Sequence, residues 1–136
     1  MKVCKGLDGI ESVAKEVLSH SGNDAIVILQ GDLAAGKTTL VKAIAKELGV
    51  NEPVTSPTFS LQQCYGSNLY HYDIYNQGIE QFMSLGLFEE LEKEGLHLIE
   101  WGDERLVKLC HDAGFKTLKI VISKEEDQRC YRIEDA

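Results

Sequence analysis

Residues 31–38 have the types and the spacing of a phosphate-binding loop. They read Gly-Asp-Leu-Ala-Ala-Gly-Lys-Thr and match the pattern G-x-x-x-x-G-K-[ST] between an apolar run and a helical segment. The glycines let backbone N–H groups turn toward phosphate oxygens, and the following helix directs its positive end there. As an exposed loop residue, Lys37 would bind the β- and γ-phosphates, and the Thr38 hydroxyl would ligate Mg²⁺. A glycine turn with a solvated lysine is the disfavoured alternative. The residues expected to contact the nucleotide are Asp32, Leu33, Ala34, Ala35, Gly36, Lys37, Thr38 and Thr39.

A metal bound to phosphate also needs an acidic residue beside it, and the sequence offers two. Glu100 ends the apolar run 96–99, the position of a Walker-B acid, although aspartate is commoner there. Asp73 lies in the segment 70–73, where a period of two places His71 and Asp73 on the same strand face. Each acid could instead end a strand and face water, and spacing does not decide between these roles.

A hydroxyl-rich loop and the single tryptophan are further candidates. Thr55, Ser56 and Thr58 lie in a loop with two prolines that could act as a switch segment beside a γ-phosphate. Spacing alone favours the plainer alternative, a Ser/Thr turn that leads into a strand. Trp101 follows Glu100 directly and could form a wall of the site, although tryptophan is normally a core residue. None of the four histidines shows a nucleophile or ligand pattern, so we expect core or surface roles for them.

The elements that would position these residues follow from hydrophobic periodicity. Ala25 to Leu29 is a continuous apolar run, typical of a strand buried on both faces. A helix is expected before this strand, with apolar residues at helical spacing from 10 to 18 and Asp8 as its N-cap. A second helix is expected after it, with apolar residues from 40 to 48 and Gly49 at its C-terminal cap. We further expect a hairpin of strands 59–65 and 69–75, a helix over 79–94 interrupted by Gly86, a strand over 96–99, a helix over 104–113, and strands over 118–122 and 129–133. This order predicts a three-layer α/β fold like that of P-loop NTPases, with a mixed, mainly parallel sheet and an antiparallel hairpin.

Composition limits the class of protein. The 136 residues suit one domain spanning 1–136, and 22 acidic against 14 basic residues give a net charge of −8, which argues against strong direct binding of nucleic acid. No segment has the length and apolarity of a membrane span or a signal peptide, so a cytoplasmic protein is expected. The four cysteines have no zinc-ligand spacing and are expected to be reduced thiols rather than a disulfide framework; they are Cys4, Cys64, Cys110 and Cys130.

The positions of the arginines limit which reactions are expected of this protein. Arg105, Arg129 and Arg132 are the only arginines, and none lies between the phosphate-binding loop and Asp103. Small P-loop kinases clamp the transferring phosphate with an arginine-rich lid, and hydrolysis is accelerated by an arginine finger. The sequence therefore disfavours a kinase and predicts slow unaided hydrolysis.

Taken in order, these motifs resemble the TsaE family, also called YjeE, the small bacterial P-loop ATPases required for threonylcarbamoyladenosine formation in tRNA. The resemblance covers nearly the whole chain. It is carried by the phosphate-binding loop 31–39, T-S-P-T-F at 55–59, Y-H-Y-D at 70–73, L-G-L-x-E-x-L at 85–91 and I-E-W at 99–101. The second, third and last of these motifs together are far more specific than a P-loop alone.

The resemblance implies an accessory ATPase that uses ATP and Mg²⁺ and acts on the TsaB–TsaD pair. It implies that Lys37 and Thr38 bind phosphate and Mg²⁺, that Glu100 assists the metal and that Asp73 positions the attacking water. It also implies a switch-like role for Thr55, Ser56 and Thr58 and a contribution of Trp101 to activity. The chain departs from the family pattern at Ala34, often glycine, and at Asn76, commonly arginine. The alternatives are a nucleotide-dependent binding module with incidental hydrolysis and, less favoured, a small kinase.

Overall fold

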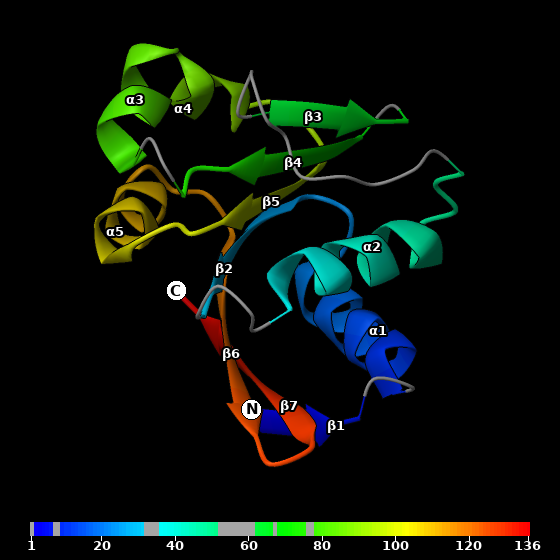
Figure 1. Cartoon of the computed structure of the whole chain (residues 1–136). Helices are drawn as coiled ribbons and strands as arrows, with labels where there is room; N and C mark the ends of the chain where they lie inside the picture. Colours follow the sequence, from blue (N-terminus) through cyan, green and yellow to red (C-terminus); the bar gives the residue numbers. More distant parts are fainter. Residues whose placement is uncertain (1, 7–8, 32–35, 52–61, 67, 76–77) are drawn as a thin grey trace.

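In the computed structural model, two layers of helices enclose a seven-stranded mixed sheet (Figure 1). The structure describes residues 2–6, 9–31, 36–51, 62–66, 68–75 and 78–136. The elements are β1 (Lys2–Lys5), α1 (Ile10–Ser21), β2 (Ala25–Gln30), α2 (Lys37–Glu47), β3 (Gln62–Tyr65), β4 (Leu69–Asp73), α3 (Gly78–Ser84), α4 (Leu87–Glu90), β5 (Leu96–Glu100), α5 (Glu104–Asp112), β6 (Thr117–Glu125) and β7 (Gln128–Asp135). The predicted fold class, three-layer α/β with a mixed sheet, is confirmed.

The centre of the sheet is parallel and its edges are antiparallel. The strand order is β1-β7-β6-β2-β5-β4-β3. Strand β2 pairs in parallel with β5 and β6, and β4 pairs in parallel with β5. Strand β3 returns antiparallel to β4, while β7 and β1 extend the other edge as antiparallel strands. Strands β2, β5 and β4 therefore end at one common edge of the sheet.

Each face of β2 packs against its own layer of helices, which explains why this strand does not alternate between apolar and polar residues. Val27 and Leu29 belong to one core cluster together with residues of α1 and α2. Ile26 and Ile28 belong to a second cluster with residues of α3, α4 and α5. Figure 1 shows α1 and α2 on one side of the sheet and the other three helices on the opposite side.

Several boundaries differ from those expected. The helix expected over 79–94 is two short helices, α3 and α4, because Gly86 between them adopts φ +74° in the left-handed region. Helix α1 has Gly9 at its N-cap position rather than Asp8, which lies outside the described residues. The hairpin is described only from Gln62 to Asp73, and the last two strands are longer than predicted.

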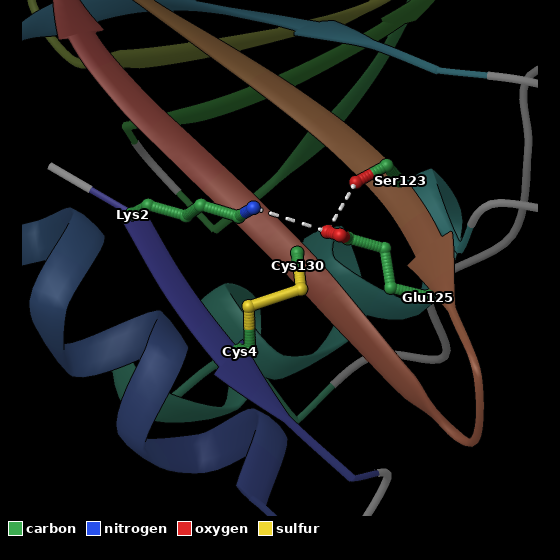
Figure 2. Close-up of a disulfide and its surroundings, with 5 residues drawn as sticks. All are labelled: Lys2, Cys4, Ser123, Glu125 and Cys130. Atoms are coloured by element: carbon green, nitrogen blue, oxygen red, sulfur yellow. Dashed lines mark hydrogen bonds and ion pairs between the residues drawn. A yellow bond between two sulfur atoms is a disulfide. The ribbon is translucent and has the colours of Figure 1, made fainter.

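Strand β1, which the sequence pattern did not predict, overturns part of the interpretation of the cysteines. It pairs antiparallel with β7 and places Cys4 opposite Cys130, with Cα atoms 4.1 Å apart, and the two residues form a disulfide (Figure 2). The expectation of reduced thiols is therefore wrong for this pair, because 126 residues of separation hide a contact that only the sheet order creates. Cys64 and Cys110 are free thiols, as expected. No helix of the described residues is long and apolar enough to cross a membrane.

Candidate functional site

The candidate site lies where the central parallel strands end and α2 begins. Strand β2 ends at Gln30, and α2 begins at Lys37 after an N-cap glycine, Gly36, with φ +100°. Gly31 has φ +151°, so both glycines of the motif occupy backbone conformations that other residues rarely adopt. In open α/β sheets, ligands bind beyond the carboxyl ends of the parallel strands. The glycine positions thus suit a loop that approaches a ligand at this edge.

Lys37 is buried rather than exposed. Only 3% of its surface is accessible, which corrects the expectation of an exposed loop lysine. Its Nζ donates to the carbonyl oxygen of Gly31 at 2.8 Å and lies 3.7 Å from the centroid of the Trp101 ring. A buried ammonium requires such compensation, and the face of an indole ring attracts a cation. Trp101 therefore forms a wall against the lysine, as one of the two sequence interpretations predicted.

The backbone holds Trp101 in this place. The residue has φ +70°, which is uncommon for a bulky side chain, and its N–H donates to the carbonyl of Leu29 at 3.0 Å. Gly102 follows it, and a Cβ there would lie 2.6 Å from a methyl carbon of Ile28, so the close approach requires glycine. Backbone conformations of this kind persist where the surrounding structure fixes them, and they are frequent at functional sites.

Thr38 and Glu100 are in direct contact. The hydroxyl of Thr38 lies 2.9 Å from Oε1 and 3.0 Å from Oε2 of Glu100, whose side chain is almost completely buried. His71, which is fully buried, adds its Nε2 at 2.5 Å from the same Oε2. The sequence pattern predicts His71 and Asp73 on one strand face but indicates no role for His71 at the site. The pairing of β4 with β5 brings this histidine to the carboxylate.

Asp73 lies beside Glu100, because the two residues are partners in the β4–β5 register. Its Oδ1 accepts a hydrogen bond from the backbone N–H of Tyr75 at 3.1 Å. Burial raises the pKa of Asp73, and the charge of Glu100 raises it further. The ring of Tyr75 lies 4.5 Å from that of Trp101, centroid to centroid, and so closes one side of this group. The structure brings together both acids that the sequence proposed.

The oxygen donors of the site suit Mg²⁺. Thr38 offers a hydroxyl oxygen and Glu100 a carboxylate, and Mg²⁺ prefers such hard oxygen ligands. The Thr38 hydroxyl donates its hydrogen to Glu100, and a hydroxyl oxygen can ligate a cation through its lone pairs. Mg²⁺ usually retains several waters and is held by one or two protein groups together with phosphates. These two residues therefore fit the metal that the sequence predicted.

Arg129 of β7 lies near the start of α2, which sequence spacing did not reveal. A Cβ on Gly36 would lie 3.8 Å from Nε of Arg129. A cavity of about 150 Å³ beside it is lined by Gly36, Thr39, Asp127, Arg129 and Tyr131. The absence of arginine between the loop and Asp103 therefore does not mean that arginine is far from the loop in space.

Part of the predicted site lies outside the described residues. This applies to Asp32, Leu33, Ala34 and Ala35 of the loop, to Thr55, Ser56 and Thr58 of the proposed switch segment, and to Asn76. Their roles stay predictions. The residues whose geometry is described, and which form one contiguous group, are Lys37, Thr38, His71, Asp73, Glu100 and Trp101.

Comparisons with known proteins agree with this arrangement. Residues 4–132 match the family model described as threonylcarbamoyl adenosine biosynthesis protein TsaE. The tRNA threonylcarbamoyladenosine biosynthesis protein TsaE of Bacillus subtilis is 34% identical over 123 residues, which cover 86% of this chain and 73% of that protein. The TsaE protein of Treponema pallidum is 45% identical over 82 residues, or 58% of this chain.

The chain spans only 61% of the Treponema pallidum protein and 53% of the TsaE protein of a Nostoc strain, which is 40% identical over 88 residues. Among solved structures, the crystal structure of YdiB from Bacillus subtilis superposes with a TM-score of 0.72 at 28% identity and covers 100% of this chain and 84% of that one. Its fold supports the P-loop-like architecture described above. From the family match along nearly its whole length, together with the residues gathered at its strand ends, this chain belongs to the TsaE family.

Proposed function

We propose that this protein binds Mg·ATP at the strand ends and hydrolyses it as an accessory ATPase in threonylcarbamoyladenosine modification of tRNA. The observation that carries the proposal is the contact between the Thr38 hydroxyl and the buried Glu100 carboxylate, beside the buried ammonium of Lys37. A hydroxyl, an acid and a lysine at the start of a helix are the groups with which P-loop proteins hold a metal and phosphates. A structural role alone would not require two buried charged groups, Lys37 and Glu100, at the edge of a sheet.

Each residue has a distinct part in the proposed chemistry. Lys37 binds phosphate oxygens through its ammonium, and Trp101 shields this charge from water. Thr38 and Glu100 hold the metal, which neutralises charge on the transferred phosphoryl group when it is bound. Asp73 orients the attacking water, and its raised pKa is consistent with a carboxylate that accepts a proton late in the reaction.

The proposed partners are TsaB and TsaD. The net charge of −8 makes this chain a poor binder of a phosphate backbone by itself, so the partners would hold the tRNA. Dependence on these partners agrees with the slow unaided hydrolysis that the sequence predicts. Without partners we expect fewer than about one turnover per minute, as in P-loop switches that lack assistance.

Steady-state phosphate release, measured with and without purified TsaB and TsaD from the same source, tests the proposal. We expect the partners to accelerate hydrolysis. If nucleotide binds but the partners leave hydrolysis negligible, the protein is a nucleotide-dependent binding module. If the isolated chain turns over at kinase-like rates and the partners change nothing, the accessory role is wrong.

A further inference from the structure

Among the described residues, His71 makes its hydrogen bond to the candidate site through Glu100. It lies in β4, opposite Leu98 of β5, and is completely buried. A carboxylate accepts hydrogen bonds, so Nε2 of His71 carries the hydrogen that points to Oε2 of Glu100 at 2.5 Å. The other ring nitrogen, Nδ1, is buried and has no hydrogen-bond partner among the described residues.

The two carboxylate oxygens of Glu100 differ in the hydrogen bonds that they accept. Oε2 is approached by both His71 and Thr38, whereas Oε1 is approached by Thr38 alone in the contacts described. A second donor on one oxygen fixes the rotation of a carboxylate about its terminal bond. Because Oε2 accepts two hydrogen bonds and Oε1 accepts one, Oε1 keeps more lone-pair density for a further ligand near the Thr38 hydroxyl. That is the oxygen best placed to face a cation shared with Thr38.

A second buried histidine shows what a purely structural role looks like. In His97 of β5, Nδ1 lies 2.7 Å from the hydroxyl of Tyr72, and Nε2 donates to the carbonyl of Lys93 at 2.9 Å. Its ring stacks on that of Tyr70, with centroids 4.4 Å apart. Both nitrogens of His97 are satisfied, whereas His71 leaves one unsatisfied. Because an unpaired buried polar atom is unfavourable for folding, packing alone would be served better by an apolar side chain at position 71.

We propose that His71 is a positioning residue that orients Glu100 toward the Mg²⁺ of bound nucleotide. This inference rests on the proposed Mg·ATP site. Groups that hydrogen-bond a metal ligand from behind fix its orientation, and their loss commonly weakens metal binding. His71 need not touch the nucleotide, and its effect is confined to the metal-dependent part of nucleotide affinity.

Two substitutions at position 71 test the contributions of the two ring nitrogens separately. In His71→Gln the amide nitrogen stands as many bonds from Cβ as Nε2 does, so it can still donate to Glu100. In His71→Asn the amide nitrogen takes the place of Nδ1 and does not reach the carboxylate. ATP affinity is measured by calorimetry with excess Mg²⁺ and, separately, with EDTA. The ratio of the two affinities gives the contribution of the metal to nucleotide binding.

We expect His71→Asn to reduce this ratio about tenfold, as for other partners of metal ligands, while the affinity in EDTA stays unchanged. His71→Gln should retain most of the ratio. His97→Gln is the matched control: it disturbs a buried histidine on the adjacent strand, so it should lower stability but leave the ratio intact. An unchanged ratio in folded His71→Asn overturns the inference, as does equal loss of affinity with and without the metal.

A measurement on the unmodified chain decides the matter if His71→Asn fails to fold. The imidazole ¹⁵N resonances of His71 should shift when Mg²⁺ is added to the ATP complex, while those of His97 stay in place. Resonances of His71 that do not respond contradict the inference. A wrong assignment of the Mg·ATP site gives a different result, because the unmodified protein would then not bind ATP in either buffer.

Discussion

The two ends of the sheet use polar residues in opposite ways. At the carboxyl edge of β2, β5 and β4, charged and polar side chains are buried and contact one another, as Lys37, Glu100 and His71 do. Along β1, β7 and β6 the charged residues form ion pairs in water, for example Lys2 with Glu125 at 3.3 Å, with side chains 51% and 49% exposed. Burying a charge is unfavourable for folding, whereas a surface ion pair changes stability little. The first region therefore holds the candidate site, whereas the second contributes a disulfide and surface ion pairs.

Reduction of the Cys4–Cys130 disulfide should have the largest effect, and only on stability. The bond closes a loop of 126 residues, for which the chain-entropy model gives up to about 5 kcal/mol, with about 2–4 kcal/mol typical of measured disulfides. Denaturant unfolding of Cys130→Ser, compared with the oxidised protein, measures the loss. Cys64→Ser, a change at an exposed free thiol, is the control. A large loss of ATP affinity in folded Cys130→Ser would break the division between the two regions.

Lys37→Ala should have its main effect on ATP affinity rather than on stability. Loss of the ammonium removes charged hydrogen bonds to phosphate, which together are worth about 3 kcal/mol, or more than a hundredfold in affinity. Calorimetry with Mg·ATP measures the change, and thermal unfolding checks that the variant is folded. Lys42→Ala, at an exposed lysine of the same helix, should bind normally. Normal affinity in folded Lys37→Ala would mean that the loop is not a phosphate site.

The two acids should differ in which step they affect. Glu100→Gln removes the proposed metal ligand and should weaken Mg·ATP binding as well as turnover, because a bound metal acts already in the ground state. Asp73→Asn should lower kcat about a hundredfold and leave binding nearly intact, as expected of a group that acts in the transition state. Both variants are assayed with TsaB and TsaD present. The reverse pattern would exchange the two roles.

The smallest effect is expected beside the disulfide, at Lys2. Lys2→Ala removes the exposed ion pair with Glu125 shown in Figure 2, and stability should change by less than about 0.5 kcal/mol. Urea unfolding of the oxidised variant measures this change. A loss above about 1 kcal/mol would show that this edge depends on its charges as well as on its covalent bond.

Sequence predicted those parts of the molecule that depend on local pattern. The motif predicted Lys37 and Thr38 as site residues, and the strand pattern predicted Glu100 and Asp73 as candidate acids. Only the structure places the two acids side by side. The role of His71 and the position of Arg129 depend on which strands are neighbours. Strand β5 lies between β2 and β4, and β6 lies between β2 and β7, and no local pattern encodes that β5 and β6 flank β2.

The errors at the N-terminus have the same physical origin. Strand β1 has four residues and two lysines at its ends, which is too little for a periodic signal. Without it, Cys4 had no neighbour, and the disulfide could not be inferred. The burial of Lys37 was also missed, because it depends in part on the ring of Trp101, which an unusual backbone conformation places over the ammonium.

The disulfide also determines how the molecule carries mechanical load. Tension applied between the residues before Cys4 and those after Cys130 would pass directly through the two sulfur atoms. The chain between them, which includes helices α1 to α5 and the strands that carry the candidate site, would lie off the loaded path. In a pulling experiment the oxidised protein should therefore lengthen only by its short ends, and the full contour of the intervening chain should be released only after reduction.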